Sequence, residues 1–203
     1  MISGPSGAGK GTLIHRVMQR TPHLTCSVSA TTRRPRAGEK DGKDYFFLKE
    51  LEFKVWVQAD RFLEWAEYGG HLYGTPRKAV NDQLALGNDV ILEIELEGAR
   101  QVLDQRENAA MIFIMPPSLE ELERRLRLRN TESEDALGKR LARAEEEISD
   151  VRGKVWRGRR QFDYVIVNDS VERASEELAD VIGEIRRNDE QAHDRRDPHR
   201  SCK

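Results

Sequence analysis

The chain has 203 residues, of which 37% are hydrophobic and 34% charged, enough apolar material for one core with smaller appended parts. Its 34 basic and 36 acidic residues leave neither sign of charge dominant, which argues against a dedicated nucleic-acid-binding protein. The two cysteines are too few for a disulfide framework, and no apolar run approaches the roughly 20 residues of a membrane span. We therefore expect a cytoplasmic protein that binds neither nucleic acid nor a membrane.

The stretch from Gly4 to Thr12, GPSGAGKGT, has the Gly-x4-Gly-Lys spacing of a loop that wraps a phosphate chain. Its glycines allow backbone N–H groups to point into one cavity, and Lys10 adds a positive charge. The helix expected over residues 10–19 would place its positive N-terminus behind the phosphates. The alternative is a glycine-rich turn with a chance lysine.

Two features of this loop depart from the usual pattern. Gly11 stands where serine or threonine usually follows the lysine, so the hydroxyl of Thr12 is the candidate Mg²⁺ contact. Only residues 1–3 precede the loop, fewer than the about five residues of a typical strand. A truncated start is therefore one expectation.

Residues 28–78 are punctuated by Arg, Gly and Pro and contain aromatic strand formers, which predicts a small inserted lobe with a mixed sheet. Several of its residues could together clamp one phosphate dianion, because guanidinium groups and hydroxyls both donate to phosphate oxygens. These residues are Ser29, Arg33, Arg34, Arg36 and Tyr45. A solvated basic loop is the alternative that composition leaves open.

Three apolar runs read as buried parallel strands: residues 89–95, 111–115 and 163–168. Because they alternate with helical sequence, they predict an α/β core with a parallel sheet in three layers, built from residues 1–27, 79–116 and 161–186. Glu93 or Glu95 would lie at a strand end, where open parallel sheets collect ligands.

A polar, arginine-rich insert occupies residues 117–160. Ser118 and Glu121 have the spacing of a capping box and predict a helix start. Arg125 and Arg129 are four residues apart and share one helical face, and Arg140 belongs to the next helical stretch. These arginines either bind a ligand or form a solvated face paired with glutamates.

The end of the insert and the end of the chain are predicted to be less regular. Residues 149–161 are expected to form an extended, solvated helix end, with contact to an anionic partner or another subunit as the alternative. Residues 171–185 place apolar side chains on one helical face. Residues 187–203 lack apolar periodicity and are expected to be disordered.

The chain carries SATTRRPRAGEKDGKDY, FLEWAEYGGHLYGTP, LEIELEGA and VIVND in this order. From residue 2 to about residue 185 it resembles the guanylate kinase family, whose members transfer a phosphoryl group from ATP to GMP. The resemblance implies a P-loop core, a mixed α/β GMP-binding lobe at 28–78 and a helical lid at 117–160. Residue 95 is usually aspartate in the family, and Asn130 replaces a glycine.

The resemblance also assigns residues to ligands. It implies an ATP site of Gly4, Pro5, Ser6, Gly7, Ala8, Gly9, Lys10, Gly11, Thr12 and Asn168. It implies a GMP site of Ser29, Arg33, Arg36, Tyr45, Glu64, Tyr73, Thr75 and Glu93. The residues that would neutralise charge on the moving phosphoryl group are Lys10, Arg33, Arg36, Arg125, Arg129 and Arg140. Mg²⁺ would accompany ATP, near Thr12 and, through water, Glu95.

Guanine presents donors at N1 and at the 2-amino group, so the carboxylate of Glu64 would select it against adenine. A phosphate acceptor is already a nucleophile at neutral pH, because its second pKa is about 6, and needs no general base. The competing hypothesis is a non-catalytic, guanylate-kinase-like module that binds proteins. The intact phosphate loop favours the enzyme, and the sequence leaves the oligomeric state undetermined.

Overall fold

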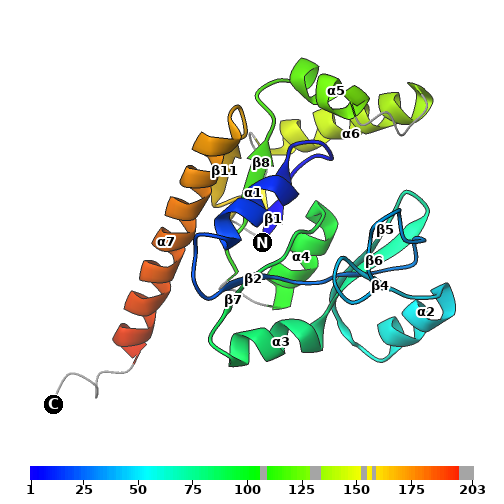
Figure 1. The fold of residues 1–203 in the computed structure, drawn as a ribbon. Helices are drawn as coiled ribbons and strands as arrows, with labels where there is room; N and C mark the ends of the chain where they lie inside the picture. The colour runs from blue at the N-terminus through cyan, green and yellow to red at the C-terminus, as the bar shows by residue number, and fades with distance from the viewer. Residues whose placement is uncertain (106–108, 129–133, 152–154, 157–158, 197–203) are drawn as a thin grey trace, which may run out of the picture.

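The computed structural model describes residues 1–203 except 106–108, 129–133, 152–154, 157–158 and 197–203. The elements in chain order are β1 (Ile2–Ser3), α1 (Lys10–Met18), β2 (Leu24–Cys26), β3 (Ala30–Thr31), β4 (Phe46–Phe47), α2 (Glu50–Gln58), β5 (Phe62–Tyr68), β6 (His71–Pro76), α3 (Arg77–Ala85), β7 (Asp89–Ile91), α4 (Leu96–Gln105), β8 (Ile112–Met115), α5 (Leu119–Leu128), α6 (Glu134–Val151), β9 (Val155–Trp156), β10 (Arg159–Arg160), β11 (Tyr164–Val167) and α7 (Val171–Arg196) (Figure 1).

The core sheet is parallel, in the order β2-β7-β1-β8-β11. The short β1 joins its two halves: Ile2 lies opposite Ile112, bridges Glu93, and donates its N–H to the carbonyl of Leu92 at 2.8 Å. Three predicted strands are thus confirmed with shifted ends. All carboxyl ends lie at one edge, where the loops of an open sheet form binding sites.

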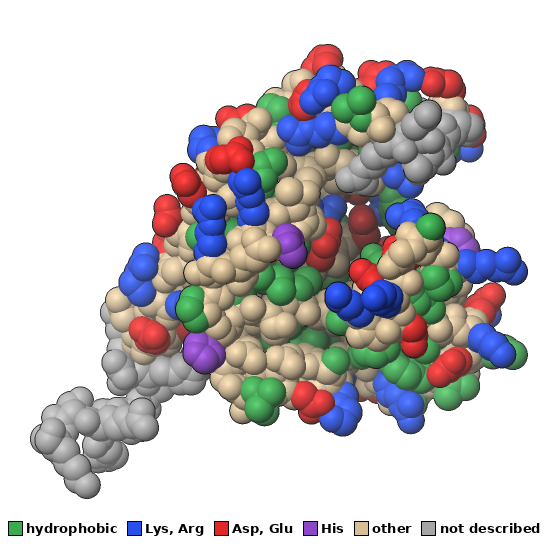
Figure 2. Space-filling view, in the orientation of Figure 1, with side chains coloured by type: hydrophobic (Ala, Val, Ile, Leu, Met, Phe, Trp, Pro, Cys, Tyr) green, Lys and Arg blue, Asp and Glu red, His purple; other side chains and the backbone are tan. Residues whose placement is uncertain are grey.

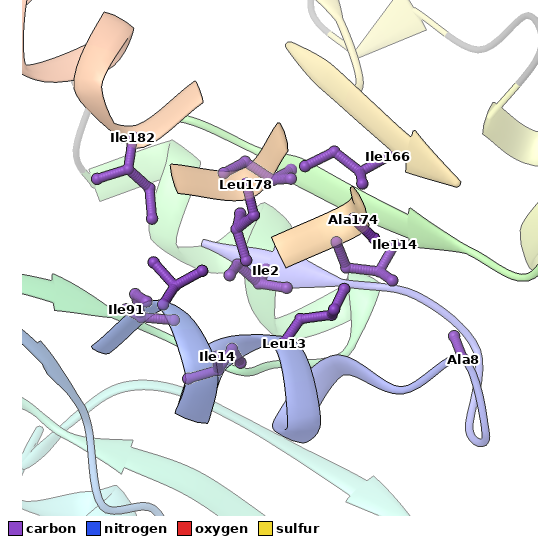
Figure 3. Close-up of a cluster of buried hydrophobic side chains, with 12 residues drawn as sticks. Ile2, Ala8, Leu13, Ile14, Ile91, Ile114, Ile166, Ala174, Leu178 and Ile182 are labelled. Carbon is purple, nitrogen blue, oxygen red and sulfur yellow. The ribbon is translucent and has the colours of Figure 1, made fainter. Parts of the chain in front are cut away.

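Helices cover both faces of this sheet, which confirms the predicted three layers. On one face, α1 and α7 pack Leu13, Leu178 and their neighbours against the strand residues Ile114 and Ile166 (Figure 3). On the other, α3 and α4 contribute Val80 and Val102 to a second buried cluster. Strand side chains are apolar on both faces, as expected for a parallel sheet covered on both sides.

The small lobe, residues 28–78, contains a four-stranded sheet in the order β4-β3-β6-β5. Strand β6 pairs antiparallel with β3 and β5, while β3 and β4 are parallel, so the sheet is mixed as predicted. Helix α2 covers it by stacking Phe53 on Phe62, with 4.5 Å between ring centroids. The lobe therefore has a buried cluster of its own.

Helices α5 and α6 form a pair held together by Leu122, Leu126, Leu137 and Ala144. The start of α5 is as predicted, since the N–H of Glu121 donates to Oγ of Ser118 at 3.2 Å. The expected helix end over residues 149–161 is wrong beyond Val151, because β9 and β10 pair there as antiparallel strands. The strand formers Val155 and Trp156 outweigh helix continuation.

Helix α7 continues to Arg196, so the prediction of a disordered tail is wrong for residues 187–196. The rest of that tail, residues 197–203, lies outside the described residues. Helix propagation adds one hydrogen bond per residue once the helix is anchored, and charged residues are compatible with it. Within the described residues, no helix is both long and apolar enough to cross a membrane.

Candidate active site

The phosphate loop connects β1 to α1 at the carboxyl edge of the sheet. Two of its glycines are required by geometry. A Cβ on Gly4, whose φ is 142°, would lie 2.2 Å from the carbonyl oxygen of Ile114. Gly9, with φ 93° in the left-handed region, forms the N-cap of α1, and a Cβ there would meet the amide of Asn168 at 2.3 Å. The loop therefore fits closely against β8 and β11.

Asn168 supports this loop from the end of β11. It is 2% exposed, and its Nδ2 donates to the carbonyl of Ala8 at 2.7 Å. The backbone carbonyl of Asn168 accepts a hydrogen bond from Nη2 of Arg125 at 2.9 Å. The amide nitrogen of this side chain is thus bonded to the phosphate loop, while its Oδ1 is buried without a partner among the described residues.

Two of the three lid arginines are brought beside the loop. Arg125 also donates to Glu121 at 2.8 Å, and Arg140 on α6 donates to Oγ of Ser6 at 3.2 Å. The ammonium of Lys10 donates to the carbonyls of Gly4 and Pro5. Arg129 lies outside the described residues.

The small lobe gathers the basic and aromatic residues expected there. The guanidinium of Arg33 lies 5.3 Å from the ring centroid of Tyr45, and the Tyr45 and Tyr73 rings are 6.2 Å apart. Burial raises the pKa of Tyr45, with a further contribution from Glu93. Ser29 adjoins this group, and its carbonyl accepts the N–H of Phe46.

Glu39 organises the arginines, although the resemblance assigned it to no ligand. Its two oxygens accept bonds from both terminal nitrogens of Arg33 at 2.9 Å, and one also accepts the N–H of Arg36 at 2.7 Å. Bonds from Arg33 hold the pKa of Glu39 below its usual range. Its place in the stretch SATTRRPRAGEKDGKDY, three residues after Arg36, is the sequence signal that could have identified it.

Glu64 lies on β5 and is 6% exposed. Its Oε1 accepts a 2.6 Å bond from the hydroxyl of Thr75 on β6, the strand paired with β5. Its Oε2 faces the first turn of α4, where a Cβ on Gly98 would lie only 2.2 Å away. A buried carboxylate with one committed oxygen can accept bonds from a ligand's donors.

Burial raises the pKa of Glu64 to about 7, although the bonds from Thr75 oppose this shift. The folded state therefore binds the proton more tightly than the unfolded chain. The free energy of unfolding should fall as pH rises from about 4.5 to about 7 and then level off. We expect ligand-free Glu64→Gln to gain thermal stability relative to the wild type between about pH 5 and pH 8.

Thermal unfolding at the two pH values measures this difference, with Glu67→Gln as the control because Glu67 is exposed on the same strand. A stability difference between Glu64→Gln and the wild type that is the same at both pH values would contradict the assignment.

The two acidic residues after β7 face different neighbours. A Cβ on Gly11 would lie 3.8 Å from Oε2 of Glu93, so this carboxylate lies beside the phosphate loop. Partial removal from water raises the pKa of Glu93, although the residue keeps an exposed face, and the positive charge of Lys10 opposes the shift. Glu95 contributes to the raised pKa of Glu64. Glu95 also contributes to the raised pKa of Glu93, and its Oε2 lies 3.3 Å from Nη2 of Arg143.

Figure 2 shows a hollow between the helix pair and the small lobe, with acidic and basic side chains inside it. A phosphate loop, nearby arginines and an acceptor lobe beside one strand end define a P-loop kinase of small phosphorylated substrates. The family model described as guanylate kinase matches residues 1–185.

The guanylate kinase of Rubrobacter xylanophilus is 54% identical over 173 residues, which are 85% of this chain and 86% of the relative. That of Synechocystis sp. is 49% identical over 172 residues, with the same shares. The crystal structure of guanylate kinase from Anaplasma phagocytophilum has a TM-score of 0.71 and 32% identity, and the match covers 93% of this chain and 85% of that one. The chain belongs to the guanylate kinase family of nucleoside monophosphate kinases.

Proposed function

We propose that this protein transfers the γ-phosphoryl group of ATP directly to GMP, forming ADP and GDP. The observation that carries the proposal is the course of the chain after β7: Glu93 lies beside the phosphate loop, and Gly98, five residues later, lies against the buried carboxylate of Glu64. A donor site and an acceptor site therefore adjoin. The family membership and the named guanylate kinase relatives support the same reaction.

The donor phosphates would be held by the loop from Gly4 to Thr12, with Lys10 on the transferring group. Arg125 and Arg140 would neutralise charge on that group, because they already lie beside the loop. We extend this role to Arg129 on the resemblance alone. Asn168 would act by holding the phosphate loop through its bond to the carbonyl of Ala8, rather than by contacting adenine.

The acceptor phosphate would be held in the small lobe, residues 28–78, as the GMP-binding lobe. Its ligands would be Ser29, Arg33, Arg36, Tyr45 and Tyr73. Arg33 and Arg36 position the acceptor oxygen and reduce the repulsion between the two phosphate groups. No residue needs to act as a base, since the acceptor oxygen is ionised at neutral pH.

Guanine would be read by Glu64, whose ionised carboxylate accepts from N1–H and from the 2-amino group. Thr75, whose hydroxyl donates to Glu64, would fix the orientation of this carboxylate in the base pocket. The raised pKa implies weaker GMP binding as pH falls below about 7, because the protonated carboxyl accepts fewer bonds.

Mg²⁺ would accompany ATP, where it neutralises charge on the β- and γ-phosphates. Within the described part of the chain no three His, Cys, Asp or Glu side chains group as a metal site. That fits a Mg²⁺ ion that takes most of its ligands from phosphate and water. The exposed hydroxyl of Thr12 and the carboxylate of Glu93 are the protein groups placed to reach it.

The helix pair, α5 and α6, which belongs to the segment 117–160 that the resemblance assigns to a lid, would exclude water from the transfer. We infer a cytoplasmic location from the sparse cysteines and the ATP requirement. The alternative of a non-catalytic binding module is disfavoured, because Lys10 and the complete phosphate loop would serve no purpose in it.

Product analysis tests the proposal. The protein with ATP, GMP and Mg²⁺ should yield ADP and GDP in equal amounts, and ADP formation should nearly cease when GMP is omitted. A folded protein that binds GMP yet forms no GDP would favour the binding module. ADP formation independent of GMP would indicate a hydrolase instead.

For Glu39→Gln, a positioning role and a purely electrostatic role predict opposite changes in KM for GMP. If Glu39 positions the arginines, Glu39→Gln should raise KM for GMP about tenfold and leave KM for ATP unchanged, because Arg33 loses its charged bidentate partner. Net charge alone predicts tighter GMP binding after a negative charge is removed. Steady-state kinetics with GMP and ATP distinguish the two roles. Glu50→Gln is the control, because Glu50 and its partner Lys54 form an exposed pair on α2.

A further inference from the structure

Arg143 is an arginine that the phosphate chemistry above does not use. It lies on α6, and its Cζ is 4.5 Å from the ring centroid of Tyr68 at the end of β5. Its Nη2 lies 3.3 Å from Oε2 of Glu95, and its Nε donates to Glu147 at 3.0 Å. One side chain of the helix pair thus contacts both the small lobe and the core.

These contacts differ from the other ion pairs on the same helix face. Lys139, one turn earlier, pairs with Asp135 within α6, and both side chains are more than three-quarters exposed, at 77% and 79%. Exposed pairs of this kind contribute little. Arg143 is 46% exposed, whereas its partners Glu95 and Glu147 are 34% and 15% exposed. Stacking on an aromatic ring adds to the ion pairs.

The charges around Arg143 argue against a phosphate ligand. Its guanidinium is held between the carboxylates of Glu95 and Glu147, which would repel a phosphate group. Arg140, one turn earlier, has a different environment, since it donates to Ser6 in the phosphate loop. The helix therefore carries one arginine directed at the donor site and another directed at the small lobe.

We propose that Arg143 is a positioning residue that holds the helix pair closed against the small lobe through Tyr68 and Glu95. The closed arrangement keeps Arg125 and Arg140 over the phosphate loop while the acceptor lobe is occupied. This inference rests on the proposed function and adds a residue to it. Because Arg143 acts on closure and not on the reacting atoms, its loss weakens the binding of both substrates together.

Arg143→Ala should lower kcat/KM for both ATP and GMP by about tenfold, mainly through higher KM values, with kcat changed less. Tyr68→Leu should have the same effect, and the double variant should add little to either single change. Arg143→Lys retains a cation and Tyr68→Phe retains a ring, so both should recover most of the loss. Lys139→Ala is the matched control on the same helix and should resemble the wild type.

Steady-state kinetics on the full chain, with thermal unfolding of every variant, distinguish the outcomes. Paired losses for both substrates at unchanged unfolding temperature, rescued by lysine or phenylalanine, support the proposal. Arg143→Ala that matches Lys139→Ala, or a loss confined to one substrate, or fully additive single changes would overturn it. A wild-type protein without GMP phosphorylation would instead overturn the proposed function.

Discussion

Replacing Lys10 with alanine is expected to lower kcat by about 10²-fold or more, because the loop would lose its only side-chain charge for the transferring group. The ammonium now donates to the carbonyls of Gly4 and Pro5, so it lies across the loop where the phosphate chain would bind. Its charge stabilises the transition state more than the ground state, so kcat should fall more than KM rises.

The measurement is ADP formation at saturating ATP and GMP, with circular dichroism to establish folding. Lys78→Ala is the control, because Lys78 is 86% exposed and pairs with Asp82 on α3. Activity of Lys10→Ala within about threefold of the wild type would contradict the proposed role of Lys10.

Gly98→Ala is expected to raise KM for GMP by about 10²-fold, although the change adds only one methyl group. The new Cβ would lie 2.2 Å from Oε2 and 2.9 Å from Cδ of Glu64, so the carboxylate must leave its position. Each charge-assisted bond to guanine contributes about 1.5–3 kcal/mol, and 1.4 kcal/mol corresponds to a factor of ten. Preference for GMP over AMP should fall in parallel.

Gly138→Ala provides a matched control, because Gly138 lies in α6 with no atom within 4 Å of a Cβ built there. Both replacements favour helix formation by about 0.5–1 kcal/mol, so a loss specific to Gly98→Ala cannot come from helix propensity. Kinetics with GMP and AMP give the comparison. Unchanged KM for GMP in Gly98→Ala would show that Glu64 does not read the base from this position.

The features predicted well from the sequence depend on local backbone chemistry. The spacing of glycines before Lys10 specified the phosphate loop, and Ser118 specified the start of α5. Apolar runs identified strands of the core because both faces of a parallel sheet are buried. The resemblance supplied the identities of Glu64 and Thr75, which the structure brings within 2.6 Å of each other.

Other features depend on contacts between distant segments, which periodicity does not report. The approach of Gly98 to Glu64 requires the packing of α4 against β5, and the approach of Arg143 to Tyr68 requires α6 to lie within reach of the end of β5. Glu93 lies beside Gly11 of the phosphate loop, whereas Glu95 pairs with Arg143 on α6, and the sequence alone does not distinguish these neighbours. The positioning role of Glu39 follows from the structure alone, because its carboxylate joins the Arg33 side chain to the Arg36 backbone.

The central claim is that this chain phosphorylates GMP and selects it by its base. The most direct measurement is ADP formation with ATP, Mg²⁺ and, in separate reactions, GMP, AMP, UMP and CMP, for the wild type and Glu64→Gln. The account predicts turnover with GMP, little with the other three, and a reduced preference for GMP in the variant. Equal turnover with all four nucleotides, or none with GMP by a folded protein, would contradict it.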